Sequence, residues 1–207
     1  MTTAKSEDTK RRLVQAAIDT ISSEGIAKVS ARTIAERAGL AQGLVFYHFG
    51  TVSDLIGEAC LEATRARVDR YAARFDAVDD LTGLVDLADD LHREERAAGT
   101  VAVLGQILAA AQADPALAVA AGDALALWTA RVSDVLRRVL AGSPFGDILA
   151  PDALAELVAA AFVGIELTEP TRGDDGLDRA LGSIRRLTSA MDDLGPVARR
   201  AVRSALK

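Results

Sequence analysis

The side chains that most often carry catalysis or bind metal ions are few in this sequence and far apart. There are two histidines, His48 and His92, and one cysteine, Cys60. A zinc site needs three or four closely placed ligands, and a nucleophile needs a base within hydrogen-bond reach. The sequence contains no glycine-rich phosphate loop and no nucleophile elbow. We therefore expect no metal, no cofactor and no enzymatic activity. An enzyme would gain support only if Glu166 and His92 met in a closed, wet cavity.

The composition favours an all-α protein in a reducing compartment. Hydrophobic residues make up 50% of the chain and charged residues 26%, as in folded globular proteins. Aromatic residues make up only 4%, and Ala and Leu, which are the best helix formers, are abundant. The polar segment 1–12 does not resemble a signal peptide. Glu156 and Glu166 interrupt the most apolar stretch, so we expect no membrane span. A lone Cys60 cannot form an internal disulfide, which fits the cytoplasm and a small buried side chain.

A short turn between two short helices carries the most specific signal. Ser30 can cap a helix over 31–38, a tight turn follows at 39–41, and a further helix is predicted over 42–48. Two short helices joined by a three-residue turn that contains glycine are typical of a helix-turn-helix. An earlier helix is predicted from Ser6 to a left-handed cap at Gly25.

Three residues give this helix-turn-helix its physical basis. The small side chain of Ala35 lets the two helices approach closely. Gly39 supplies the backbone angles of the turn, and Leu40 fills the space between the helices. The helix over 42–48 can then present its other face to the major groove of DNA.

The charge distribution permits DNA binding at the N-terminal end. Residues 1–57 carry seven Lys or Arg and six Asp or Glu, a net charge of +1. The rest carries seventeen and twenty-four, a net charge of −7, which gives the total of −6. The acidity therefore lies outside the segment that would face phosphates, and the overall charge does not exclude a nucleic-acid partner.

Residues 9–56, from TKRRLVQ through ARTIAERAGLAQGLVFYHF to SDLI, resemble the DNA-binding domain of the tetracycline-repressor (TetR) family. The resemblance implies a DNA-binding domain over 1–50 with three helices, and a helical ligand-binding and dimerisation domain over 51–207. Members of this family are usually dimeric repressors that a small molecule releases from operator DNA. These properties are what the resemblance predicts for this chain.

The resemblance also assigns DNA contacts. Arg32 matches a position that reaches DNA, Gln42 and Gly43 open the recognition helix, and Tyr47 and His48 match phosphate-contacting positions. Arginine pairs best with guanine and glutamine with adenine, whereas Tyr and His can donate to phosphate oxygens. The full predicted set is Arg32, Thr33, Ala41, Gln42, Gly43, Leu44, Phe46, Tyr47 and His48.

Three positions depart from the usual family pattern. Leu44 stands where Thr is common, Phe46 where Tyr is common, and Val52 where a phosphate-binding Lys is common. Two hydroxyls and one cation are therefore missing. Backbone amides at the start of the next helix could replace the cation, and Leu44 and Phe46 could contact thymine methyl groups.

Helical periodicity continues through the rest of the chain. Thr51 and Asp54 are spaced as a capping box for a long fourth helix. Asp114 and Pro115 suit the first positions of another helix, Gly99 separates two helices, and 142–151 reads as a loop. The further predicted helices cover 81–91, 101–108, 117–139, 154–170 and 177–194, with a short one from 196.

The predicted ligand pocket lies among the helices after the helix-turn-helix. Its candidate lining is Tyr71, Phe75, His92, Leu104, Gln106, Leu108, Trp128 and Phe162. Core packing is the alternative for each of these side chains, because pockets and cores share the same residue types. Walls rich in Ala and Leu favour an apolar or amphipathic small-molecule effector.

The last two long helices are predicted to form a homodimer interface. Its candidate residues are Leu154, Leu157, Val158, Phe162, Ile165, Leu181, Ile184, Leu187 and Met191. Two recognition helices of a dimer must lie about 34–36 Å apart, or a multiple of this, to enter successive major grooves. The alternative function is a helical, ligand-sensing dimer whose DNA binding is weakened or lost.

Overall fold

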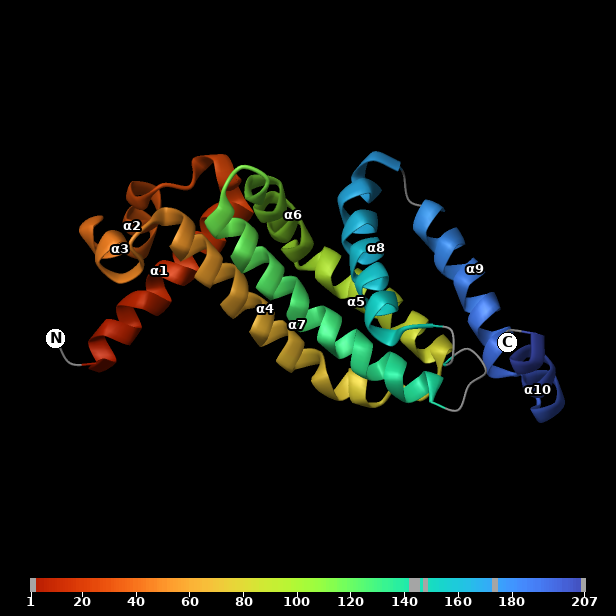
Figure 1. The fold of residues 1–207 in the computed structure, drawn as a ribbon. Helices are drawn as coiled ribbons and strands as arrows, with labels where there is room; N and C mark the ends of the chain where they lie inside the picture. Colours follow the sequence, from red (N-terminus) through yellow and green to blue (C-terminus); the bar gives the residue numbers. More distant parts are fainter. Residues whose placement is uncertain (1–2, 142–145, 147–148, 173–174, 206–207) are drawn as a thin grey trace. The chain divides into compact units, whose positions relative to one another are not determined.

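The computed structural model describes residues 3–141, 146, 149–172 and 175–205. Within these residues all regular structure is helical, which confirms the all-α prediction (Figure 1). The elements are α1 (Thr3–Glu24), the 3-10 helix η1 (Ile26–Lys28), α2 (Ala31–Ala38), α3 (Gly43–Phe49), α4 (Val52–Asp76), α5 (Leu81–Ala97), α6 (Thr100–Ala111), α7 (Pro115–Leu140), α8 (Pro151–Arg172), α9 (Asp175–Asp192) and α10 (Pro196–Ala205).

These helices form two compact units, each described separately below. Unit 1 contains residues 3–67 and 99–125, and unit 2 contains residues 68–98 and 126–205. The helices α4 and α7 contribute residues to both units. Unit 1 therefore includes α6 and the first part of α7 in addition to the predicted helix-turn-helix.

The first core of unit 1 joins α1, α2, α3 and the start of α4. Leu13, Ile34, Val45 and Leu55 are each 0% exposed and lie in this core. Each comes from a different helix, and within α1 the core residues Leu13, Ala16 and Ala17 follow the helical period, so one face of that helix is turned inward. Burying a large aliphatic side chain contributes about 1.5–3 kcal/mol. This core fixes the orientation of α3, which is too short to be stable alone.

The predicted helix-turn-helix geometry is confirmed. Ser30 caps α2 by accepting a hydrogen bond from the Thr33 amide (3.1 Å). Gly39 adopts the left-handed conformation (φ 63°), and the Leu40 amide donates to the Ala35 carbonyl (2.9 Å). Leu40 is half-buried against the first core.

Two expectations for α1 were wrong. The helix begins at Thr3, so Ser6 lies inside it and does not cap it. Gly25 has a positive φ of 85°, but its ψ of 158° is extended and not left-handed helical. The reason is that η1 follows at once, and the chain must leave α1 in an extended direction to enter that turn.

A second core of unit 1 ties α6 and the start of α7 to the helix-turn-helix. It contains Ile21, Ile56, Cys60, Ile107 and Leu117. Burial raises the pKa of the Cys60 thiol, as expected for a small buried side chain without a reactive role.

Two side-chain hydrogen bonds reinforce this second core. The Gln106 amide oxygen accepts from the Ile26 backbone N–H (2.7 Å), and Ser53 donates to Asp114 (2.5 Å). Asp114 also accepts from the Ala116 backbone, which confirms it as the cap of α7. The Ser53 bond, together with these backbone bonds, lowers the pKa of the Asp114 carboxyl.

Unit 2 has its own core, formed by α5, the C-terminal part of α4, the later part of α7 and the start of α8. Its buried residues include Tyr71, Phe75, Leu91 and Leu136, with Trp128 packed against them. Arg138 donates to the carbonyls of Phe75 (2.8 Å) and Val78 (3.1 Å). This guanidinium thereby adds hydrogen bonds to carbonyls at and just after the end of α4, where the Phe75 carbonyl also accepts from the Val78 amide (3.3 Å).

The helix α9 joins α5 through polar contacts. Arg185 pairs with Asp86 (2.6 Å) and Asp89 (3.3 Å). Near the end of α9, Asp192 accepts from the Thr82 amide (2.9 Å) and the Thr82 hydroxyl (2.7 Å). The polar face of α9 is therefore its inward face.

Two further helices need comment. Among the described residues, only α7 is long and apolar enough to cross a membrane by length and composition, and a buried core helix has the same properties. The helix α8 continues past Pro170, where we expected it to end, to Arg172. A proline in a last turn removes only one hydrogen bond, so the helix can finish beyond it. Most of the predicted loop 142–151 lies outside the described residues.

The close approach of α4 and α7 in unit 1 depends on Gly57. A Cβ placed on Gly57 would lie 2.8 Å from the Cβ of Ala120. We expect Gly57→Ala to lower the free energy of unfolding by about 1–3 kcal/mol through this clash. At a solvent-exposed position inside a helix, replacement of Gly by Ala normally raises the free energy of unfolding by about 1 kcal/mol. Chemical denaturation measures the difference.

The matched control is Gly122→Ala in α7, because no described atom lies within 4 Å of a Cβ at that position. It should leave stability unchanged or raise it. Ala120→Gly should recover part of the loss in the Gly57→Ala protein. Equal stabilisation by both Gly→Ala changes would contradict a tight contact at Gly57.

Candidate nucleic-acid interface

The short helix α3 has one buried face and one exposed face. Val45 is 0% exposed in the first core, and Leu44 and Phe49 are half-buried against it. On the other side, Phe46 is 49% exposed and Tyr47 74% exposed. The exposed residues Gly43, Phe46, Tyr47 and Gly50 follow the spacing of one helical stripe. This stripe is the surface of α3 that a partner can reach.

The other predicted DNA contacts lie at the edge of this stripe. Ala41 and Gln42 are exposed in the turn before α3. Arg32 is exposed on α2 and pairs with Glu36 (2.8 Å). An exposed ion pair of this kind contributes little to stability, so the guanidinium can readily change partner.

Thr33 is placed differently from the other predicted contacts. Its hydroxyl accepts from the Ser30 amide (2.9 Å) and donates to the Lys28 carbonyl (3.0 Å). Together with the Ser30 cap, this completes a capping box at the start of α2. The Thr33 side chain therefore stabilises the start of α2.

Leu44 and His48 are only partly accessible. Leu44 is half-buried against the first core. His48 is also half-buried, and its Nε2 atom is buried without a hydrogen-bond partner among the described residues. The ring contacts Tyr47 edge-on, with centroids 4.9 Å apart. A phosphate contact from Nε2 would require the imidazole to move.

The start of α4 carries a capping arrangement where the family usually has a lysine. Val52 is half-buried against both cores of unit 1. The Asp54 amide donates to the Thr51 hydroxyl (3.0 Å), which confirms the predicted cap. The Thr51 hydroxyl in turn donates to the Asp54 carboxylate (2.6 Å). This corner supplies backbone amides but no cationic side chain.

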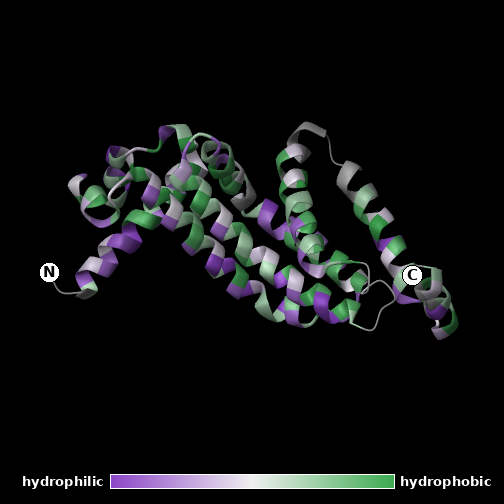
Figure 2. Cartoon of the chain, viewed as in Figure 1, coloured by the Kyte–Doolittle hydropathy of each residue, from purple (hydrophilic) through white to green (hydrophobic). Residues whose placement is uncertain are grey.

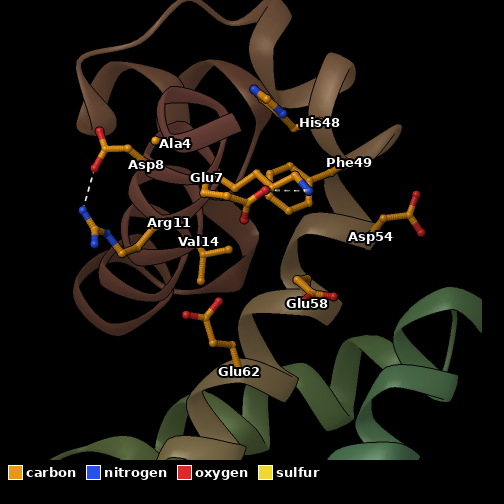
Figure 3. Close-up of a pocket in the computed structure, with 11 residues that line it drawn as sticks. Ala4, Glu7, Asp8, Arg11, Val14, His48, Phe49, Asp54, Glu58 and Glu62 are labelled. Carbon is orange, nitrogen blue, oxygen red and sulfur yellow. Dashed lines mark hydrogen bonds and ion pairs between the residues drawn. The ribbon is translucent and has the colours of Figure 1, made fainter. Parts of the chain in front are cut away.

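A hollow of about 760 Å³ opens between α1, the end of α3 and the start of α4 (Figure 3). It is strongly acidic, because Glu7, Asp8, Asp54, Glu58 and Glu62 all line it. The two cations on its wall are paired, Lys10 with Glu7 (3.8 Å) and Arg11 with Asp8 (2.5 Å). Its remaining lining is Ala4, Val14, His48 and Phe49. No group of three or more His, Cys, Asp or Glu among the described residues could hold a metal ion.

The position of this hollow bears on how DNA can approach. His48 and Phe49 belong to the buried side of α3, so the hollow lies away from the exposed stripe. A carboxylate-lined wall repels phosphate. The exposed stripe, with Gly43, Phe46 and Tyr47, carries no carboxylate.

The predicted ligand-pocket residues are divided between the two units. Leu104, Gln106 and Leu108 belong to unit 1, where Gln106 bonds to Ile26 and the two leucines pack on the second core. The others lie in unit 2, namely Tyr71, Phe75, His92, Trp128 and Phe162. In unit 2, the Trp128 ring lies 6.1 Å from that of Tyr71 and 6.2 Å from that of Phe75. The His92 ring lies 6.5 Å from that of Phe162.

Glu95, which lies in the same part of unit 2, was not among the residues predicted from the sequence. It is 6% exposed and accepts a hydrogen bond from the Tyr71 hydroxyl (2.8 Å). Its burial could have been predicted from the helical period, because Glu95 follows Leu91 by one turn on the buried face of α5. Burial and the bond to Glu95 raise the pKa of Tyr71 to about 12.

The predicted dimer residues fall into two groups. Leu154 and Val158 pack against the core of unit 2, and four others are half-buried, namely Phe162, Ile165, Leu181 and Met191. Leu157, Ile184 and Leu187 are 64%, 46% and 62% exposed. Figure 2 shows the ribbon of α8 coloured mostly as hydrophobic. The side chain of Glu166, which the sequence analysis paired with His92, lies outside the described residues.

A helix-turn-helix with an exposed recognition helix, followed by further helices, is the architecture of a one-component transcriptional regulator. Residues 13–59 match the profile of the bacterial regulatory proteins of the tetR family. A curated relative, an uncharacterized HTH-type transcriptional regulator of Mycobacterium tuberculosis, is 30% identical over 158 residues, which is 76% of this chain and 80% of the relative. The chain belongs to the TetR family of transcriptional regulators.

Solved structures agree with this assignment. A transcriptional regulator from Streptomyces coelicolor A3(2) superposes with a TM-score of 0.68 at 26% identity, over 87% of this chain and 98% of that one. The multidrug binding protein EbrR, solved in complex with imidazole, gives a TM-score of 0.63 at 25% identity, over 88% and 93%. The matched family, the curated relative and the Streptomyces coelicolor protein are transcriptional regulators, which confirms the expectation that the chain is not an enzyme.

Removing the Thr33 hydroxyl tests its structural task. We expect Thr33→Val, which keeps the side-chain shape, to lower the free energy of unfolding by about 1–2 kcal/mol, because the capping box is lost. Thr51→Val, which removes the cap of α4, is the comparison and should cost a similar amount. Thermal and chemical unfolding measure both. An unchanged stability in Thr33→Val would show that the hydroxyl serves some other purpose.

The buried Tyr71 hydroxyl has a pH signature. Because its pKa is raised, the folded state favours the protonated phenol. That contribution to stability is complete below pH of about 10 and is lost as pH rises towards 12. The chain has two tyrosines, so in the Tyr47→Phe protein the absorbance of tyrosinate comes from Tyr71 alone. Its tyrosinate absorbance should appear with a midpoint of about 12 in the folded protein. A midpoint near 10 would contradict the buried bond to Glu95.

Proposed function

We propose that this chain is a repressor that binds a palindromic operator as a homodimer and is released by a small molecule. The observation that carries the proposal is the exposed stripe of α3, Gly43, Phe46 and Tyr47, on a helix held by its opposite face. Residues 1–50 act as the DNA-binding domain and residues 51–207 as the ligand-binding and dimerisation domain.

The DNA contacts follow from accessibility. Arg32, Gln42 and Phe46 lie where they can reach base edges, and Tyr47 can reach a phosphate. Ala41 and Gly43 allow close approach of the DNA at the start of α3. Thr33, Leu44 and His48 contribute mainly by holding the helices in place, since each is engaged or partly buried.

The dimer is proposed on the distribution of polarity over α9. Its polar residues Arg185 and Asp192 bind α5, whereas Ile184 and Leu187 remain exposed. A helix of a monomer normally places its apolar side inward, so the reverse arrangement favours a second apolar surface as partner. Leu157 on α8 adds to this surface. Related by a two-fold axis, α8 and α9 of two protomers would bury it.

The effector is proposed to be an apolar or amphipathic small molecule that binds in unit 2, in the cytoplasm. A buried polar pair, Tyr71 and Glu95, lies there. The Trp128 ring lies 6.1 Å from that of Tyr71, and the buried His92 lies on the same helix as Glu95. An environment of this kind binds molecules with a large apolar area and a few polar groups. The structurally similar EbrR, described as a multidrug binding protein, is consistent with this class of ligand.

Release requires only a modest shift in equilibrium. A dimer bound to DNA must keep its recognition helices about 34–36 Å apart, or a multiple of this. A ligand that favours another position of α4 by a few kcal/mol would depopulate this spacing. Because this distance depends on both protomers, a ligand bound in one protomer would weaken the DNA contacts of both recognition helices.

Selection of genomic DNA fragments by the purified protein tests the proposal. We expect enrichment of one palindromic site, bound with a dissociation constant of about 10⁻⁸–10⁻¹¹ M and a steep dependence on salt. Leu187→Glu should yield a monomer in sedimentation and lose the palindromic site. Val119→Glu is the control, because Val119 is equally exposed (67%) but lies on α7.

The alternative function is a ligand-sensing dimer without DNA binding. It is favoured by Val52 in place of a cation, and by the acidic hollow beside α3. A folded, dimeric protein that enriches no DNA fragment at low salt would establish this alternative and exclude the repressor.

A further inference from the structure

We propose that Phe46 determines operator sequence by contacting the C5-methyl group of a thymine in the major groove. The inference rests on the proposed DNA-binding function and assigns a base preference to one residue. It follows from the chemistry of the groups that the exposed stripe of α3 offers to a base pair.

The exposed stripe contains very little hydrogen-bonding capacity. Phe46 is 49% exposed and has no polar atom, and Gly43 has no side chain. No described atom lies within 4 Å of a Cβ placed on Gly43, so the packing of the protein does not require glycine there. A missing side chain at that point leaves room for a base pair to approach the Phe46 ring. Tyr47 carries the only side-chain hydroxyl on the stripe.

Neighbouring groups cannot take over base reading at this position. The Thr33 hydroxyl is held by Ser30 and Lys28, and Leu44 packs on the first core. The Tyr47 ring lies edge-on against His48 and is 74% exposed, so its hydroxyl is the polar group that the stripe offers beside Phe46. Phe46 is the apolar side chain that projects from the middle of the stripe.

A phenyl ring distinguishes only one feature of the major groove. Guanine, adenine and cytosine present hydrogen-bond acceptors and donors there, which a phenyl ring would leave without partners. Thymine also presents a methyl group, and apolar side chains are its natural contacts. Gln42 lies four residues before Phe46, on the same side of the helix, and glutamine pairs best with adenine. Together they favour an A·T-containing step in each half-site.

Replacement of thymine by deoxyuridine isolates the methyl group, because base pairing is unchanged. The selected operator is synthesised with each thymine replaced in turn by deoxyuridine, symmetrically in both half-sites. Binding to the full-length wild-type protein is then measured. Replacement of one particular thymine in each half-site should lower the affinity of the protein for the operator about fourfold per half-site. This is the value expected for the loss of one buried methyl group.

The protein variants identify the side chain that reads this methyl group. Phe46→Ala should bind the thymine and deoxyuridine operators equally, whereas Phe46→Leu should keep most of the discrimination because leucine is also apolar. Tyr47→Ala is the matched control and should weaken binding to both operators by the same factor. Thermal unfolding of each variant checks that these substitutions at exposed positions leave the DNA-binding domain folded.

Three results would overturn the inference. Wild-type protein that binds its operator without loss at any deoxyuridine contradicts the methyl contact and leaves the DNA-binding function standing. Discrimination that persists in Phe46→Ala shows that another residue reads the methyl group. Wild-type protein that binds no DNA overturns the proposed function and the inference together.

Discussion

The fold of unit 1 depends on the burial of Val45. A helix of seven residues does not form alone in water, so α3 is held by packing against the first core. Val45 is its fully buried residue, and Leu44 and Phe49 are half-buried beside it. Burial of this one side chain fixes which face of α3 turns inward. The opposite face, with Gly43, Phe46 and Tyr47, is then exposed by the helical period. The candidate interface is thus a consequence of the core and needs no separate device to orient it.

Polar contacts hold the surroundings of this core in place. Gln106 and Asp114 connect α6 and the start of α7 to η1 and α4 within unit 1. In unit 2, Arg138 closes the end of α4 and Asp192 attaches α9 to the start of α5. Each contact pairs a side chain with a group near a helix end, where backbone groups are otherwise unsatisfied. These bonds orient α9 so that Ile184 and Leu187 are exposed.

Much of the fold could be predicted from local sequence. Gly39, Leu40 and the cap at Ser30 define the helix-turn-helix because turn geometry depends on adjacent residues. Helix limits were less certain, as Ser6, Gly25 and Pro170 show, because packing outweighs local preference at the ends of helices.

The roles of particular side chains were harder to predict, because they depend on contacts between residues far apart in the chain. Gln106, taken as a pocket residue, bonds to Ile26, and the buried Glu95 was not recognised. Whether Leu44 reads DNA or packs cannot be read from its type, since both uses favour an apolar residue. The acidic hollow joins residues from α1, α3 and α4 and has no counterpart in any single segment.

We propose that the stripe of α3 enters the major groove in a two-fold dimer. The most direct test is a crystal structure of the full chain bound to its selected operator. In this complex the recognition helices of two protomers should lie about 34–36 Å apart, or a multiple of this, with Gly43, Phe46 and Tyr47 towards the DNA. A complex in which α3 faces solvent, or in which another surface holds the DNA, would contradict it.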